Sequence, residues 1–120
     1  MARTVGVEGD EVVVRLTGLT AVAALKRELR IPRAAIVSVS AGIPEQLGWR
    51  KAGTSIPWTD YKQGHFSSGG RKAFYSFEHR DRAVTLELDG RFVPGGWELV
   101  VVGVDDPAAP VRYFGTASSR

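Results

Sequence analysis

The sequence predicts a mainly β (α+β) fold, built as a strongly bent antiparallel sheet or partly open barrel of about seven strands. Three observations predict it. Short segments alternate apolar and polar residues with a period of two, β-branched residues concentrate in those segments, and turn-forming residues separate them. One or two short helices complete the prediction. The 120 residues suit a single domain over 1–120, with an ordered core over about 8–110.

The first strand is predicted at residues 11–17. Val12, Val14 and Leu16 face one way there, and the residues between them face the other. The next segment, 19–29, carries leucines and a valine at roughly helical spacing among several alanines. Because alanine and leucine favour helix, this segment is predicted to form a helical turn or two.

An extended segment and a second strand follow the predicted helix. Residues 29–32 read as a short extended piece that Pro32 ends or places at a sheet edge, because proline cannot donate to a ladder. Residues 35–40 are predicted to be a strand with Val37 and Val39 on one face.

Residues 41–59 are predicted to be a long loop, because glycine and proline recur throughout the segment. The segment nevertheless carries three large apolar residues, which a purely solvated loop would not: Trp49, Ile56 and Trp58. A long loop with apolar anchors either folds back on the core or contributes to function.

The second half of the chain alternates more regularly. Residues 61–66 and 72–79 are predicted strands, joined as a hairpin by the glycine-containing link 67–71. A further strand over 83–89 alternates throughout. The last strand, 97–104, is apolar on both faces, which predicts a central position or a contact surface.

Composition excludes several classes of function. The chain has no cysteine, so disulfides, thiolate metal sites and cysteine nucleophiles are excluded. No apolar stretch approaches the roughly 20 residues of a membrane span, and no secretion signal is recognisable, so a cytoplasmic location, with peripheral membrane attachment as the alternative, is expected. The net charge of +3 is compatible with an anionic partner, but a basic residue composition that has no functional meaning explains it better.

Three segments resemble a known pattern: residues 25–39, residues 53–57, and residues 104–107 after the last strand. In this order they resemble a group of small uncharacterised actinobacterial proteins and, more distantly, bacterial pleckstrin-homology-like domains. The resemblance implies a seven-stranded, sharply bent sheet that a C-terminal helix closes at one end. Asp105 and Pro107 are typical of a helix start, but Pro110 interrupts the helix that the resemblance implies. The resemblance implies no activity.

The densest group of cations is the basic cluster Lys26, Arg27, Arg30 and Arg33. Such a cluster could contact an anionic lipid surface, where each cation contributes about 1 kcal/mol. The competing interpretation is an ordinary solvated face, since Glu28 interrupts the cluster. Nucleic acid is disfavoured as a partner, because no stacking aromatic residues are interleaved with these charges.

The aromatic loop residues form the second candidate surface. Large side chains such as Trp49 and Trp58 cost about 25 cal/mol per Å² of apolar area left in water. Together with Ile56 they either fill the open end of the sheet or form a contact surface for another copy of the chain or another protein.

No catalytic, metal or cofactor site is predicted. His65 and His79 would need a carboxylate such as Asp60 or Glu78 to complete a metal site, and ordinary strand positions explain them better. The segment 67–72 is not a Walker A loop, since its spacing is wrong and it joins two strands, and a plain hairpin turn explains it better than phosphate binding. The favoured function is a non-catalytic binding or scaffolding domain that self-associates. The alternatives are a peripheral membrane module and, second, a small enzyme.

Overall fold

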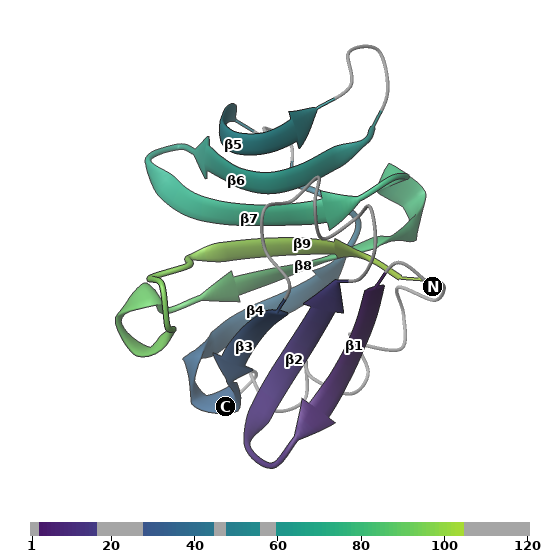
Figure 1. The fold of residues 1–120 in the computed structure, drawn as a ribbon. Coiled ribbons are helices and arrows are strands. Elements are labelled where there is room, and N and C mark those ends of the chain that lie inside the picture. Colours follow the sequence, from purple (N-terminus) through teal and green to yellow (C-terminus); the bar gives the residue numbers. More distant parts are fainter. Residues whose placement is uncertain (1–2, 17–27, 45–47, 56–59, 105–120) are drawn as a thin grey trace.

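The computed structural model describes residues 3–16, 28–44, 48–55 and 60–104, and these residues form two sheets (Figure 1). The small sheet has the order β1-β2-β3 and the large sheet the order β4-β8-β9-β7-β6-β5. The strands are β1 (Arg3–Glu8), β2 (Glu11–Leu16), β3 (Glu28–Pro32), β4 (Ile36–Ala41), β5 (Trp49–Ser55), β6 (Lys62–Ser68), β7 (Arg71–Phe77), β8 (Ala83–Leu88) and β9 (Leu99–Gly103). Three short 3-10 turns, η1 (Arg33–Ala35), η2 (Arg80–Arg82) and η3 (Gly90–Phe92), lie between strands.

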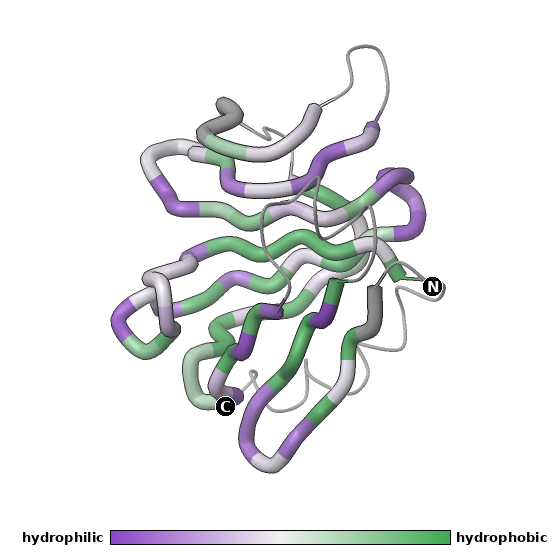
Figure 2. Tube along the Cα trace, viewed as in Figure 1, coloured by the Kyte–Doolittle hydropathy of each residue, from purple (hydrophilic) through white to green (hydrophobic). Residues whose placement is uncertain are grey.

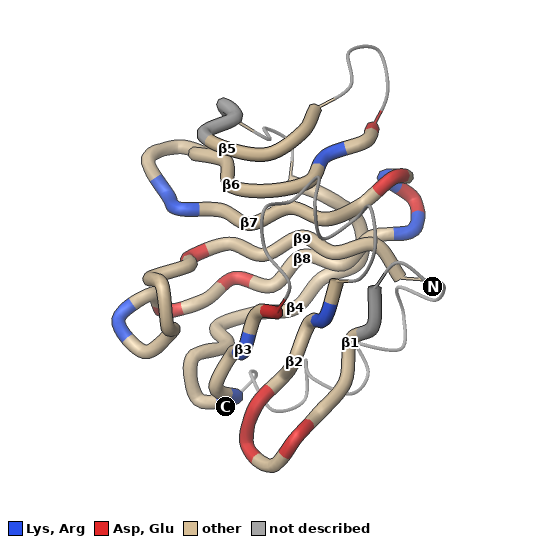
Figure 3. The backbone as a smooth tube through the Cα atoms, in the orientation of Figure 1, with Lys and Arg blue, Asp and Glu red and all other residues tan. Residues whose placement is uncertain are grey.

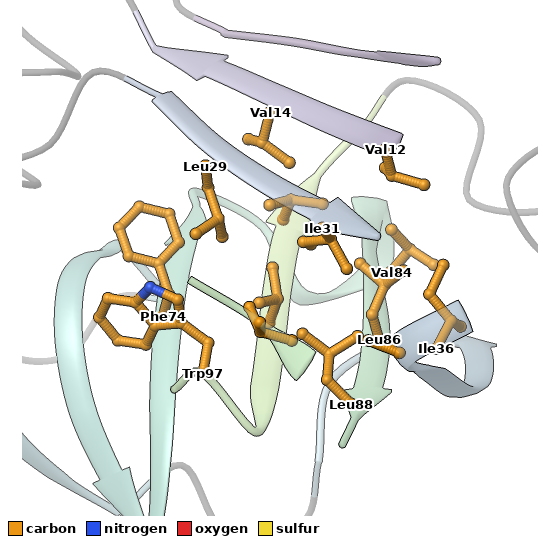
Figure 4. Close-up of a cluster of buried hydrophobic side chains, with 14 of the residues drawn as sticks. Val12, Val14, Leu29, Ile31, Ile36, Phe74, Val84, Leu86, Leu88 and Trp97 are labelled. Atoms are coloured by element: carbon orange, nitrogen blue, oxygen red, sulfur yellow. The ribbon is translucent and has the colours of Figure 1, made fainter. Parts of the chain in front are cut away.

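The main core lies between the two sheets, where the small sheet covers part of one face of the large sheet. Strands β2 and β3 contribute side chains from one side, and strands β4, β7, β8 and β9 contribute them from the other (Figure 4). Among the residues that meet there are Val12, Val14, Leu29, Ile31, Phe74, Val84, Leu86 and Val100. Burying these side chains is the main driving force for joining the sheets.

A second apolar cluster lies on the opposite face of the large sheet. Its members come from β6, β7, β8 and β9 and are all buried: Phe66, Ala73, Tyr75, Phe77, Ala83, Leu99 and Val101. Successive residues of a strand point to opposite faces, so β7 and β9 supply both clusters alternately. The hydropathy of the chain agrees with burial of the central strands on both faces, because apolar residues dominate these strands (Figure 2).

Several sequence predictions are confirmed. Strand β2 places Val12, Val14 and Leu16 in the main core, and β8 does the same with its alternate apolar residues. Strands β6 and β7 form the expected hairpin, whose turn residues Gly69 and Gly70 have φ angles of +58° and +81°. Strand β9 lies centrally, between β7 and β8.

Other predictions are corrected. The expected loop contains β5, because positive-φ glycine allows an extended strand where the sequence pattern indicated only breaks. Leu29 belongs to a strand rather than to a helix, since its pairing with Val14 buries it in the core. The predicted common face of Val37 and Val39 is wrong, because a bulge between Ile36 and Ser38 leaves Val37 56% exposed.

The architecture also differs from the expected antiparallel sheet of about seven strands. The described residues form nine strands in two sheets, and β7 and β9 pair in parallel. The rest of the predicted helix, residues 19–27, and the C-terminal helix start at 105–107 lie outside the described residues. Within the described part of the chain, no helix is long and apolar enough to cross a membrane.

Candidate functional site

The large sheet is wider than the small one, so the small sheet covers only part of its inner face, the face that carries the main core. On β6 and β7 this inner face carries polar side chains. Cross-strand pairing sets Gln63 opposite Ser76, and His65 opposite Phe74. Phe74 belongs to the main core, so these partners share the face that the small sheet covers elsewhere. By the same alternation Lys72 and Glu78 lie on this side. We call Gln63, His65, Lys72, Ser76 and Glu78 the polar strip.

A chain of hydrogen bonds runs through the polar strip. The Ser76 hydroxyl donates to Oε1 of Gln63 at 2.7 Å, and the Gln63 amide nitrogen donates to Oε2 of Glu78 at 3.2 Å. Gln63 and Ser76 are both fully buried. Because a buried amide or hydroxyl without a partner costs about 1–3 kcal/mol, these bonds hold the Gln63 side chain in one orientation.

Trp97 borders the polar strip, and its ring contacts Phe74 and two residues of the strip, His65 and Lys72. Its ring centroid lies 5.1 Å from that of His65 and 5.5 Å from that of Phe74, both in edge-to-face geometry. The Lys72 ammonium lies 4.6 Å from the Trp97 ring centroid and donates to the carbonyl of Gly95. Trp97 therefore joins the main core to the polar strip.

The Trp97 indole nitrogen is buried and has no hydrogen-bond partner among the described residues. Tryptophan N–H groups usually find an acceptor when they are buried. A Cβ atom on Gly95 would lie 2.9 Å from this nitrogen, so glycine at that position leaves the space the indole needs.

Two glycines allow β5 to pair closely with β6. Gly53 and Gly64 have φ angles of +113° and +122° and lie opposite each other. A Cβ at Gly53 would lie 2.0 Å from the carbonyl oxygen of Gln63, and a Cβ at Gly64 would lie 2.3 Å from that of Ala52. Any side chain there would force the strands apart, so these glycines position the margin of the sheet next to the polar strip.

The predicted basic cluster is only partly described, and Arg30 is not a free cation. On the outer face of the small sheet its guanidinium contacts Glu8, Glu11 and Glu28, each at 3.1 Å. Figure 3 shows that β1, β2 and β3 carry charged residues of both signs. Arg15 contacts Glu8 and Glu28 from the same face. We call these five residues the charge lattice.

The charge lattice shifts the titration of its carboxyl groups. Hydrogen bonds from Arg15 chiefly lower the pKa of Glu8, and hydrogen bonds from Arg30 chiefly lower the pKa of Glu28. The lattice lies on the same face as Val13, which is only 2% exposed although it points away from the main core.

The other predicted surface residues are not assembled into one site within the described chain. Arg33 lies in η1 and is half-buried, and its backbone N–H donates to the carbonyl of Asp10 at 2.8 Å. Lys26, Arg27, Ile56 and Trp58 lie outside the described residues. Trp49 begins β5, and its side chain is not described.

The two histidines do not come together. His65 is half-buried beside Trp97, whereas His79 is exposed and lies beyond the end of β7. Asp60 pairs instead with Arg80 at 2.8 Å, which lowers the pKa of that carboxyl group. Across the ranges that the structure describes, no group of three or more histidine, cysteine or acidic residues could hold a metal ion.

Sequence reasoning missed the polar strip and the position of Trp97 beside it. The available signal was the hairpin itself: polar residues Gln63 and Ser76 occupy inward positions of two strands whose neighbours are aromatic. Comparison of the chain with family models, curated proteins and solved structures finds no match. Function is therefore argued from the chain's own residues.

Proposed function

We propose that the chain is a non-catalytic binding or scaffolding domain that self-associates. The polar strip is the observation that carries the binding role, and the uncharged edge strand β4 is the observation that supports self-association. Binding sites are mostly apolar surfaces with a few well-placed polar groups. The strip supplies the half-buried Lys72 ammonium, Glu78 carboxylate and His65 ring near Trp97, while the fully buried Gln63 donates a hydrogen bond to Glu78.

The hydrogen bonds of the strip favour binding over catalysis. A nucleophilic serine has to give its proton to a base such as histidine or a carboxylate. The Ser76 hydroxyl donates to an amide oxygen, which cannot take up the proton. The arrangement therefore orients side chains and supplies no activated nucleophile. A small enzyme, the other class considered, has less support.

A pleckstrin-homology-like fold is part of the same proposal. The mainly β architecture supports it, as does the corner at η1, where the chain passes from the small sheet to the large one. The parallel pairing of β7 and β9 is a feature that the resemblance did not imply.

A peripheral membrane module is the weaker alternative. The charge lattice contains two arginines and three glutamates, so Arg30 already has anionic partners. Exposed pairs of this kind are also screened by salt. Co-sedimentation with vesicles that contain anionic phospholipid at low salt would show binding if the membrane alternative were right, and we expect none.

Light scattering on the full chain, over a range of concentrations, tests the self-association. We expect a mass above the 13.0 kDa of one chain that rises with concentration. A mass of 13.0 kDa at every concentration would contradict self-association and would leave only the binding role of the polar strip.

A further inference from the structure

The four edge strands of the two sheets differ in how they are protected. Unpaired strand edges invite pairing with other chains, and proteins usually block them with charges, proline or bulges. In the small sheet, β1 carries Arg3 and Glu8, and β3 carries charged residues and Pro32. In the large sheet, β5 carries Arg50 and Lys51. Strand β4 has the sequence Ile-Val-Ser-Val-Ser-Ala, which contains neither a charge nor a proline.

On the side away from β8, the backbone groups of β4 have no partner strand within the described ranges of the chain. The Gly42 N–H donates to the carbonyl of Ala83 at 2.8 Å, just after the strand. Antiparallel strands direct their N–H and C=O groups alternately to one neighbour and to the other. The N–H and C=O groups of Val39 and Ala41 therefore point away from β8, and β8 is the one partner of β4 among the described strands.

The bulge between Ile36 and Ser38 interrupts only the beginning of β4. The remainder pairs regularly with β8 up to Ala41. Val37, at the bulge, is 56% exposed, and Ala41 is also exposed. An uncharged, regular edge with an exposed valine beside it is a site for strand addition.

We propose that β4 is the seam of self-association, pairing antiparallel with β4 of a second copy about a two-fold axis. This inference rests on the proposed self-association and names the surface that mediates it. A strand that pairs with its own copy brings identical residues together, so it must carry no like charges there. Strand β4 meets this condition. Arg33, the described cation nearest to the strand in sequence, precedes it, and the two-fold axis places the two copies of Arg33 at opposite ends of the seam.

The seam continues the large sheet of one copy into that of the other. The backbone groups of Val39 and Ala41 gain partners, and the exposed apolar surface at Val37 becomes covered. The regular part of β4 is short, so the pairing is reversible and depends on concentration.

Two exposed alanines on opposite edges of the large sheet provide a matched test. Ala41→Lys places a charge on the seam, and Ala52→Lys places the same charge on the edge strand β5. Ala41→Pro is a second seam variant, which removes only the outward-pointing N–H. Far-ultraviolet circular dichroism checks that each variant keeps its β structure.

Light scattering then compares the masses of the three variants with that of the wild type. Both Ala41 variants should have the mass of one chain, 13.0 kDa, at concentrations where the wild type and Ala52→Lys are larger. Ala41 variants that stay as large as the wild type would overturn the seam and leave self-association standing. Dissociation by Ala52→Lys alone would move the seam to β5 and equally overturn the proposal. A wild type of 13.0 kDa throughout would overturn self-association itself.

Discussion

In the large sheet, strands β8 and β9 bury apolar side chains on both faces, whereas strands β5 and β6 carry glycines and polar residues. All five residues of β9 are buried. Strands β5 and β6 form the margin of the large sheet. This margin depends on Gly53 and Gly64 for close backbone pairing, and on Gln63 for a hydrogen-bonded interior. One sheet therefore combines a centre held by apolar burial with a margin held by backbone fit and hydrogen bonds.

The largest effect is expected from truncating a central side chain. Leu86 is 1% exposed and belongs to the core between the sheets. Leu86→Ala removes buried methyl groups and leaves a cavity, which should lower the free energy of unfolding by about 2–5 kcal/mol. Urea denaturation monitored by tryptophan fluorescence measures this change. A loss below about 1 kcal/mol would mean that the centre is not the source of stability.

The margin should be sensitive to backbone fit rather than to volume. Gly64→Ala places a Cβ within 2.3 Å of the Ala52 carbonyl oxygen at a φ angle of +122°, so it should lower the free energy of unfolding by about 1–3 kcal/mol. Gly6→Ala in β1 is the matched control, because a Cβ there meets no atom within 4 Å. Equal stability of the two variants in the same urea titration would contradict the observed β5–β6 pairing.

A smaller effect is expected in the polar strip. Ser76→Ala leaves the buried Oε1 of Gln63 without its donor, which should cost about 1 kcal/mol. The double variant Ser76→Ala with Gln63→Leu should recover part of this loss, because both partners are then apolar. A thermal-unfolding double-mutant cycle measures the coupling. Strict additivity of the two substitutions would show that the hydrogen bond contributes nothing.

The smallest effect is expected from the charge lattice. The pKa values of Glu8 and Glu28 lie below the ordinary 4.5, so their stabilisation is present above pH 4.5 and is lost as the pH falls through the lowered values. Both groups are exposed, so the effect should be slight and should shrink in high salt. The drop in unfolding temperature between about pH 6 and pH 3 should be smaller in Arg30→Gln than in the wild type. An equal drop in both proteins would show that the charge lattice does not contribute to the pH dependence of stability.

The same contrast explains what could be predicted from the sequence. Period-two alternation identified β2 and β8, and a run that is apolar on both faces identified β9, because burial of one or both faces dictates their residues. Strand β5 escaped prediction because its glycine signals a break in sequence but serves close backbone pairing in the fold. The polar strip depends on the cross-strand pairing of Gln63 with Ser76, and such a register is a three-dimensional property that a single strand's pattern does not contain.

Val37 illustrates the same limit. Its neighbours alternate regularly in sequence, but the bulge at the start of β4 shifts the register by a residue and turns Val37 outward. A bulge leaves no composition signal here, so the exposed valine of the proposed seam was assigned to the wrong face.

Residue-resolved amide hydrogen exchange tests most directly whether the centre and the margin of the large sheet differ in stability. We predict that the amides of β9, including that of Val100, exchange most slowly. Amides that pair β5 with β6 should exchange at least about tenfold faster, which corresponds to about 1.4 kcal/mol. Equal protection of β9 and β5, with a common opening free energy, would contradict the division of the sheet into a centre held by apolar burial and a margin held by backbone fit and hydrogen bonds.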